Sequence, residues 1–347
     1  MRRVLVTGGA GFIGAHLIRA LVRRGDAVRV LDNLIAGSAE NLSRALDVPV
    51  SQVSSVLARA DGALVPLTES CEVLVGDLLA PRAVARACEN VDVVFHQAAL
   101  RSVPRSIEDP TGTHRVNVTG TLNLLEAARA AGVRRVVFAS SSSIYGDNEV
   151  PTHEGLSPRP KSPYAASKLA GEIYCATYTR TFGLSTIALR YFNVFGPWQD
   201  PTSDYAAVIP KFIRLAKTGA SLPVHGDGLQ SRDFTYIDNV VAANLAAAES
   251  TAEGVAVNIG AGQQHSLMDL IDLIERHLGR PVTRVHEPAR AGDVRHTQAD
   301  ISLARRLIRY DPAIDFETGL RMTIEAMDDS AVRDPREPQH TPPSTVR

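Results

Sequence analysis

The chain lacks the features that mark secreted and membrane-spanning proteins. Its three cysteines, Cys71, Cys88 and Cys175, are odd in number and scattered, so a disulfide framework is not expected. There is no recognisable signal peptide and no apolar run long enough to span a bilayer. These absences make the reducing cytoplasm the expected location.

The chain has no marked excess of positive or negative charge, and it has no metal-binding motif. The formal net charge is −1, which gives no reason to expect nucleic acid or an anionic membrane as a partner. The ten histidines form neither an H-E-x-x-H motif nor a cluster with cysteine, so no metal site is expected. What remains is an ordinary globular composition, 44% apolar and 22% charged over 347 residues, enough for one large core or two modest ones.

The apolar pattern alternates between strand-like and helix-like runs. Strand-like runs occupy 3–7, 28–31, 72–75, 92–95, 134–140 and 185–190, and amphipathic stretches such as 119–132 and 162–183 lie between them. This βαβ alternation predicts an α/β fold, a doubly wound parallel sheet of the Rossmann type with helices on both faces.

The regular alternation breaks after Arg190. Glycine and proline interrupt the later sequence, which predicts a Rossmann domain over 1–190 and a smaller, loop-rich substrate lobe over 191–327. The two are expected to be interleaved, with 233–238 and 255–260 as candidates to return to the main sheet (about 233–262 in all). The insertion at 48–71 has no clear structure, and the polar, proline-rich tail 328–347 is expected to be disordered.

A glycine-rich turn follows the first strand in the stretch VLVTGGAGFIGAHLI, residues 4–18. Residues 9–14 satisfy G-x-G-x-x-G, a pattern that a bare glycine-rich turn also produces. Two features favour a dinucleotide site: the glycines lie between a predicted strand and a predicted helix, and a second strand-like run ends in Asp32 about 20 residues on. A carboxylate there accepts hydrogen bonds from ribose hydroxyls and repels a 2′-phosphate, which favours NAD over NADP.

A second constellation is formed by Tyr164 and Lys168, four residues apart in SPYAASKLAGE and therefore on one face of a helix. A Tyr/Lys pair on the protein surface, with no catalytic role, would give the same spacing. The alternative is a general base, a phenol whose pKa a nearby ammonium lowers toward neutrality. The serine-rich strand end FASSSSIYG supports that alternative, because it carries hydroxyls to the carboxyl edge of the sheet, where ligands of open α/β sheets bind.

The glycine fingerprint, the serine-rich strand end and Tyr-x-x-x-Lys together resemble the extended short-chain dehydrogenase/reductases. Within them the chain most resembles the nucleotide-sugar 4-epimerases, in particular the UDP-N-acetylglucosamine 4-epimerase branch. The resemblance covers about 2–325 and includes FHQAALRSVPRSIEDP (95–110), LRYFNVFGPWQDP (189–201), YAAVIPKF (205–212), GDGLQSRDFTYIDNV (226–240) and RAGDVRHTQADIS (290–302).

The resemblance implies a set of site residues. The catalytic residues would be Ser141, Tyr164 and Lys168. Tightly bound, recycled NAD would contact Gly8, Gly11, Phe12, Ile13, Gly14, Asp32, Asn33, Asp77, Leu78, Gln97, Ala98, Ala99, Asn117, Tyr164 and Lys168. The UDP-sugar would contact Arg101, Ser143, Asn193, Gln199, Val208, Arg232, Arg290, Asp293 and Thr297.

The reaction implied is 4-epimerisation of UDP-hexoses, UDP-GlcNAc/UDP-GalNAc or UDP-Glc/UDP-Gal, through a transient 4-keto sugar. The small Thr297 would leave room for a 2-acetamido group. A UDP-uronic acid 4-epimerase, another nucleotide-sugar dehydratase or decarboxylase, and a non-catalytic NAD-binding regulator remain as alternatives. A dehydratase would need an acid and a base where this strand end has Ser141, Ser142 and Ser143.

Analogy with the family also implies a homodimer, joined through helices at 110–131 and 162–183. Arg101, Trp198 and the 48–71 insertion depart from the family pattern. Each is expected to reshape the sugar pocket or its rim.

Overall fold

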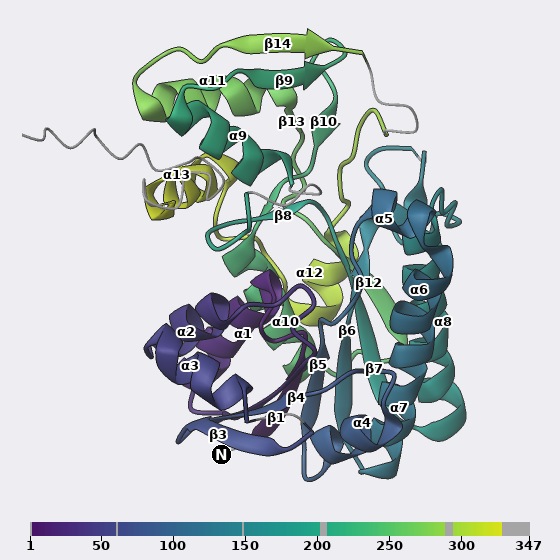
Figure 1. Cartoon of the computed structure of the whole chain (residues 1–347). Helices are drawn as coiled ribbons and strands as arrows, with labels where there is room; N and C mark the ends of the chain where they lie inside the picture. The colour runs from purple at the N-terminus through teal and green to yellow at the C-terminus, as the bar shows by residue number, and fades with distance from the viewer. Residues whose placement is uncertain (1, 60–61, 148, 202–206, 289–293, 328–347) are drawn as a thin grey trace, which may run out of the picture.

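The computed structural model describes residues 2–59, 62–147, 149–201, 207–288 and 294–327 (Figure 1). The strands are β1 (Arg3–Thr7), β2 (Ala27–Asp32), β3 (Leu64–Thr68), β4 (Cys71–Val75), β5 (Val93–His96), β6 (Arg135–Ser141), β7 (Ser185–Tyr191), β8 (Val194–Phe195), β9 (Leu222–His225), β10 (Ser231–Arg232), β11 (Thr235–Tyr236), β12 (Val255–Ile259), β13 (His265–Ser266) and β14 (Arg284–Glu287).

The α-helices are α1 (Phe12–Arg23), α2 (Ala39–Leu46), α3 (Val50–Leu57), α4 (Pro81–Cys88), α5 (Val103–Glu108), α6 (Pro110–His114), α7 (Gly120–Ala130), α8 (Pro163–Phe182), α9 (Val208–Thr218), α10 (Ile237–Glu249), α11 (Leu267–Leu278), α12 (Ser302–Ile308) and α13 (Phe316–Ala326). A π-helical turn η1 (Arg115–Thr119) precedes α7, and a 3₁₀ turn η2 (Ser142–Tyr145) follows β6.

Eight of these strands form the main sheet, in the order β12-β7-β6-β5-β1-β2-β4-β3. The neighbouring pairs are parallel, except that β3 runs antiparallel to β4 at the edge. The chain builds outward from β1 through β2 to β4 on one side, then crosses to β5 on the other. This reversal beside β1 opens a crevice at the carboxyl ends of the strands, where α/β sheets of this kind bind ligands.

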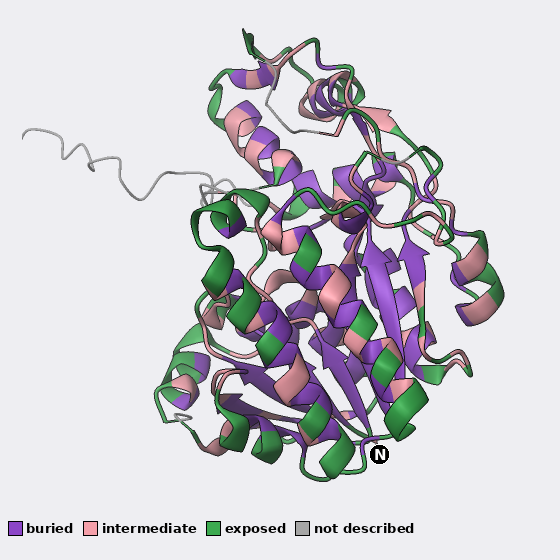
Figure 2. Cartoon of the chain, turned by 90° about the vertical axis from the view of Figure 1, so that its right-hand side faces the viewer, coloured by how far each residue is buried: buried purple, intermediate pink, exposed green. Residues whose placement is uncertain are grey.

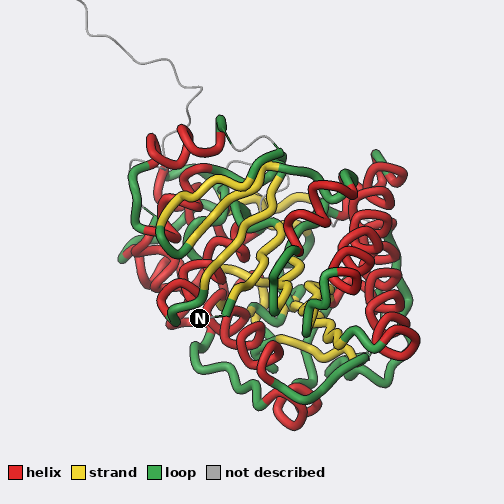
Figure 3. The backbone as a smooth tube through the Cα atoms, turned by 90° about the horizontal axis from the view of Figure 1, so that it is seen from below, coloured by secondary structure: helices red, strands yellow, loops and turns green. Residues whose placement is uncertain are grey.

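The alternating side chains of the strands supply two separate cores. Val4 and Val6 of β1 belong to one cluster and Leu5 to the other, as the two-residue period of a strand requires. The first core lies under α1, α2, α3 and α10, and the second under α4, α7 and α8 (Figure 1). Seen from below, helices flank the strands on both sides (Figure 3). Figure 2 shows the sheet buried between these layers. The doubly wound α/β fold expected from the sequence is therefore confirmed.

Helix α8 is bounded by its own sequence. The Ser162 side chain accepts a hydrogen bond from the Ala165 amide at the N-terminus, and Pro163 occupies the first helical position. Gly183, at φ 71°, ends the helix in the left-handed conformation. These signals fix which residues of α8 face the sheet.

A smaller lobe lies beyond the carboxyl edge of the sheet, at the top of Figure 1. It contains the parallel pair β9–β14 and the antiparallel pair β10–β13, with α9 and α13 packed against α11. Of the two segments expected to return to the main sheet, β12 does so, beside β7, whereas β11 in 233–238 pairs with β8 instead. The insertion forms α3 and the edge strand β3. The tail 328–347 lies outside the described residues.

In the described part of the chain, no helix has the length and apolar character needed to cross a membrane. The same residues contain no group of three or more His, Cys, Asp or Glu side chains arranged to hold a metal ion.

Candidate active site

The glycine-rich turn packs too closely for side chains. Gly8, at φ 68°, follows β1, and a Cβ on it would lie 2.8 Å from the Cα of Ala98. A Cβ on Gly14 would lie 2.2 Å from the Gly8 carbonyl oxygen, so α1 rests directly on the turn. Gly11 is the N-cap of α1 and brings no side chain to the cap. The first amides of α1 therefore face an open cradle suited to a phosphate.

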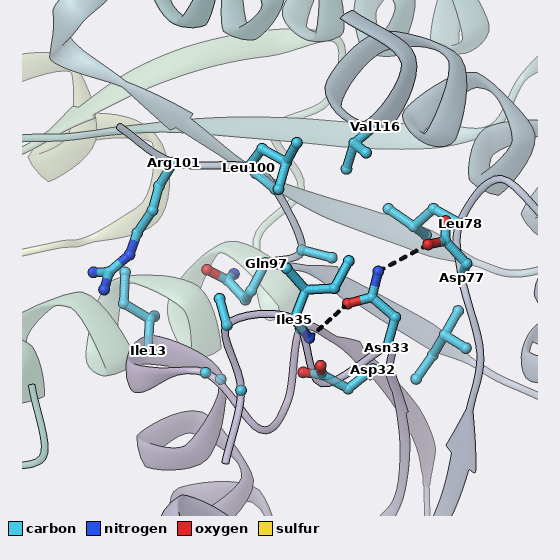
Figure 4. Close-up of a pocket in the computed structure, with 18 of the residues that line it drawn as sticks. Ile13, Asp32, Asn33, Ile35, Asp77, Leu78, Gln97, Leu100, Arg101 and Val116 are labelled. Carbon is cyan, nitrogen blue, oxygen red and sulfur yellow. Dashed lines mark hydrogen bonds between the residues drawn. The ribbon is translucent and has the colours of Figure 1, made fainter. Parts of the chain in front are cut away.

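An elongated pocket extends from this turn along the carboxyl ends of β1, β2, β4 and β5 (Figure 4). Twelve of the fifteen residues expected to contact NAD line it: Gly8, Gly11, Phe12, Ile13, Gly14, Asp32, Asn33, Asp77, Leu78, Gln97, Ala98 and Ala99. The lining also includes Leu31, Ile35, Ala36, Gly37, Gly76, Leu100, Arg101 and Val116. Sequence reasoning placed Arg101 on the sugar and missed the other seven, which lie beside the motif positions in the chain.

Asp32 closes the end of β2 and is buried. Its carboxylate accepts hydrogen bonds from the amides of Ala10 and Leu34, at 2.9 and 2.8 Å. Burial raises its pKa, and these two bonds oppose the rise. The carboxylate therefore shapes the glycine turn as well as facing the pocket. Farther along, the Asn33 amide donates to Asp77 at 2.8 Å and ties β2 to the loop after β4 (Figure 4).

A buried relay, missed by sequence reasoning, runs behind the pocket through His96. The His96 ring lies 2.7 Å from the Thr7 hydroxyl through Nδ1 and 2.9 Å from the Thr121 hydroxyl through Nε2. Thr121 donates its own proton to the Asn117 carbonyl, so His96 must donate from Nε2 and accept at Nδ1. Burial lowers its pKa to about 3, which keeps the ring neutral. The signal available in the sequence was a histidine ending an apolar strand.

Asn117 continues this relay to the catalytic helix. Its side chain accepts from the Leu100 amide at 2.8 Å and donates to the Leu100 carbonyl and to the Ser167 hydroxyl, each at 3.0 Å. Ser167 in turn donates to the Tyr164 carbonyl at 2.7 Å. Asn117 is therefore placed behind the pocket wall, joining the loop after β5 to the first turn of α8.

Ser141, Tyr164 and Lys168 meet where β6 ends against α8. The Ser141 hydroxyl is close enough to Tyr164 to lower its pKa, and the Ser143 hydroxyl donates to Ser141 at 2.8 Å. The buried Lys168 ammonium donates to the carbonyl of Ala139 at 2.8 Å and lies 5.2 Å from the centre of the Phe138 ring. The fold thus brings together the three residues that the sequence separates by up to 27 positions.

The titration of this group differs from the sequence-based expectation. Burial raises the pKa of Tyr164, while the Ser141 hydrogen bond and the charge of Arg101 oppose the rise. Burial also lowers the pKa of Lys168 to about 8.

On the lobe side, Asn193 and Thr297 lie together around Asp233. The Asn193 amide donates to the Thr297 hydroxyl and to the Asp233 carbonyl, each at 3.2 Å, and the Asp233 amide donates to the same hydroxyl at 3.2 Å. The Asp233 carboxylate is fully buried and accepts from the amides of Ala261, Gly262 and Ala299. Asp233, which sequence reasoning missed, therefore joins three segments around the expected sugar wall.

The other expected substrate contacts are spread over the lobe. The Gln199 amide donates to the Val194 carbonyl at 3.1 Å, and its buried Oε1 accepts no hydrogen bond from the described residues. Val208 is the first residue of α9, and Arg232 lies on β10, donating to the Ser231 carbonyl at 2.9 Å. Arg290 and Asp293 lie outside the described residues.

Trp198 packs against α1. At φ 71°, it stacks on His16 with ring centres 4.0 Å apart, and the Arg19 guanidinium lies 5.5 Å from the centre of its ring. It borders a second depression with Tyr236, Asp238 and Met322. Its ring joins the lobe to the outer side of α1, and its effect on the sugar pocket stays a prediction.

Residues 4–260 match the family described as the NAD dependent epimerase/dehydratase family. The chain is 36% identical over 326 residues to a UDP-glucose 4-epimerase of Mycolicibacterium smegmatis, covering 93% of this chain and 97% of that protein.

Two solved structures are similar across most of the chain. One is a UDP-N-acetylglucosamine 4-epimerase from Methanobrevibacter ruminantium M1 in complex with UDP-N-acetylmuramic acid, with a TM-score of 0.84, 36% identity, and coverage of 94% of this chain and 97% of that one. The other is a UDP-glucuronic acid 4-epimerase from Bacillus cereus in complex with UDP-glucuronic acid and NAD, with a TM-score of 0.80, 31% identity, and coverage of 93% and 98%.

Proposed function

The chain belongs to the NAD-dependent epimerase/dehydratase family, and from this membership we propose that it is an NAD-dependent 4-epimerase of UDP-hexoses. The observation that carries the proposal is the row of Tyr164 and Lys168 on α8, beside the serine-rich end of β6, at the sheet edge that also forms the dinucleotide pocket. A proton acceptor thus lies where a hydride acceptor would bind.

The pocket fits a dinucleotide, because Gly8 and Gly14 leave a cradle that any Cβ would fill. The amides at the start of α1 would hold the pyrophosphate, Asp32 the adenosine ribose, and Asp77 with Leu78 the adenine. When bound, NAD supplies a hydride acceptor and, in the return step, a hydride donor.

The residues of this chain handle the proton. Tyr164 would take the proton from the sugar O4, directly or through Ser141, as the C4 hydride leaves. It would return the proton after the 4-keto sugar has rotated to present its other face. Ser143 orients Ser141 for this transfer by donating to its oxygen. The sugar must rotate while its diphosphate stays bound. The guanidinium of Arg232 is suited to hold the diphosphate.

For the sugar, we infer that the site accepts a 2-acetamido group. Thr297 is small, and its hydroxyl is held by Asn193 and by the backbone of Asp233, so only its methyl group is free to border the sugar. The Gln199 Oε1, which is buried and accepts no bond from described residues, could take the acetamido N–H. UDP-GlcNAc and UDP-GalNAc are therefore the first substrates to test.

A second candidate, 4-epimerisation of a UDP-uronic acid, is favoured by Arg101. It is the only basic side chain among the described residues lining the dinucleotide pocket, it is exposed, and its charge acts on Tyr164. A free guanidinium near the reacting carbon would pair well with a sugar carboxylate. Dehydration is less well supported, because the strand end offers hydroxyls and no carboxyl group.

The deciding experiment incubates the purified enzyme with UDP-GlcNAc, UDP-Glc and UDP-GlcA separately and resolves each sugar from its C4 epimer. Conversion without net NADH formation supports a 4-epimerase, and the substrate with the highest kcat/KM identifies the sugar. Stoichiometric NADH accumulation would point to a dehydrogenase, and NAD binding without turnover to a regulator.

We also propose a cytoplasmic homodimer. The cysteines of the described chain are buried and free, as expected in a reducing compartment. Ile173 and Phe182 on α8 are exposed apolar side chains on a helix expected to pair. Light scattering after gel filtration, with Ile173→Glu as the interface variant, tests the dimer.

A further inference from the structure

Three polar contacts join α8 to the last three residues of β6. The Ser141 hydroxyl acts on the Tyr164 phenol, Lys168 donates to the Ala139 carbonyl at 2.8 Å, and Glu172 accepts from the Ser140 hydroxyl at 2.5 Å. The helical residues are spaced by four, so they form one row along α8. The first two contacts hold the expected catalytic pair, and the third has no role in the reaction so far described.

The helix approaches the strand unusually closely along this row. A Cβ on Gly171 would lie 2.4 Å from the Phe138 ring, so a larger residue would push α8 away. Lys168 lies over the same ring. A small displacement of α8 would therefore separate all three contacts together.

Glu172 is anchored on its far side by Arg190 of β7. Both side chains are buried, and the Arg190 Nε and Nη2 atoms donate to the Glu172 carboxylate over 2.8–3.2 Å. Arg190 also donates to the Tyr145 hydroxyl at 2.7 Å, and Tyr145 donates to Asn258 of β12 at 2.8 Å. A buried ion pair adds little net stability. The hydrogen bonds of this pair hold the Glu172 side chain in a fixed position against three strands.

Glu172 also acts on the charge of Lys168. Burial lowers the pKa of Lys168, whereas Cys175 and then Glu172, both on the same helix, raise it. From β5, His96 faces this group as a neutral ring. Arg190 on β7 is paired with Glu172 at 2.8 Å.

We propose that Glu172, paired with Arg190, is a positioning residue for the reaction, setting the register of α8 on β6 and supplying the negative charge that acts on the Lys168 ammonium. The proposal rests on the proposed function for its kinetic consequence only. The effect of Glu172 on the titration of Lys168 can be measured without substrate.

The test uses Glu172→Gln, with Glu72→Gln as the matched control. Glu72 pairs with the buried Arg29 in the same sheet, at 2.7 Å, far from the catalytic row. The chain has only four lysines, at 161, 168, 211 and 217, so NMR of ¹³Cε-labelled lysine can follow Lys168 directly, with Lys168→Arg assigning its signal. In Glu172→Gln the Lys168 titration should move down by roughly one pH unit or more. In Glu72→Gln it should stay where it is in the wild type.

Kinetics provides the second measurement. The alkaline limb of kcat should move to lower pH in Glu172→Gln with KM for the UDP-sugar nearly unchanged, whereas a loss of general stability would lower kcat equally at every pH. An unchanged Lys168 titration in Glu172→Gln overturns the proposal. If the wild type epimerises no UDP-sugar, the proposed function fails while the lysine titration still decides this question.

A buried arginine left without its carboxylate can prevent folding, so Glu172→Asp is the second variant. It keeps the charge but is one methylene too short to reach Ser140 and Arg190 at once. We expect kcat to fall at least about tenfold with the alkaline limb in place, consistent with lost positioning. A wild-type kcat in folded Glu172→Asp would overturn the positioning role.

Discussion

The side-chain amide of Asn193 donates to the hydroxyl of Thr297 over 3.2 Å, joining residues 104 positions apart. The Asp233 amide donates to the same hydroxyl at 3.2 Å. Thr297 is thus held by two donors, and its position relative to the sheet edge is fixed. That constraint makes it a suitable site for testing sugar specificity.

Thr297→Tyr should remove the space for a 2-acetamido group. We expect kcat/KM for UDP-GlcNAc to fall at least tenfold more than that for UDP-Glc, because a ring would occupy the space beside the methyl group. Thr297→Val, which keeps the size and loses the hydroxyl, measures how much of any loss comes from the two hydrogen bonds. Equal losses on both sugars, or a wild type inactive on UDP-GlcNAc, would show that Thr297 does not border the space for the 2-acetamido group.

Tyr164→Phe should abolish most turnover and leave binding intact. Removing a general base costs about 10²- to 10⁴-fold in rate. Tyr174→Phe deletes a phenol oxygen from the same helix and serves as the control. Kinetics of both variants, together with their NAD content, check the assignment. A kcat near that of the wild type in Tyr164→Phe would exclude Tyr164 as the base.

Asp32→Asn should weaken NAD and relax its selection over NADP. A hydrogen bond to a charged acceptor is worth about 1.5–3 kcal/mol, so Kd for NAD should rise about tenfold or more. Asp26→Asn, at a buried carboxylate paired with Arg24 outside the pocket, controls for stability. Calorimetric titration with both dinucleotides measures the ratio. Wild-type protein that purifies with NADP would contradict the prediction.

Asp233→Asn should flatten the pH dependence of stability. Burial raises the pKa of Asp233 from 3.8 to about 6, so the folded state binds a proton between these values that the unfolded state releases. The contribution of this carboxyl to the free energy of unfolding is therefore greatest below about pH 4 and is lost as the pH rises through about 6. The change amounts to about 3 kcal/mol.

Urea unfolding between about pH 4 and pH 7 measures this difference. Asp315→Asn is the control that should leave this slope unchanged: the Thr318 amide lowers the pKa of Asp315 from 3.8, so its contribution is lost only at pH values below this range. The prediction fails if the wild type and Asp233→Asn show the same slope.

The sequence by itself determined the doubly wound fold, because the apolar periodicity of its strands and helices is a local property. It also determined the glycine turn, Asp32 and the row containing Tyr164 and Lys168, since each depends on spacing within one element. The comparisons confirm the family from these same motifs.

Only the tertiary structure decided which distant residues meet. In the sequence, His96 is only the last residue of an apolar strand. The structure shows that its ring lies between the hydroxyls of Thr7 and Thr121. Trp198, at φ 71°, stacks on His16 of α1, a contact that no residue pattern predicted. Glu172 acquires its place only when β6 and β7 bring Ser140 and Arg190 to it. Contacts between elements depend on how the layers pack, and the pKa of each buried group depends on the burial that this packing creates.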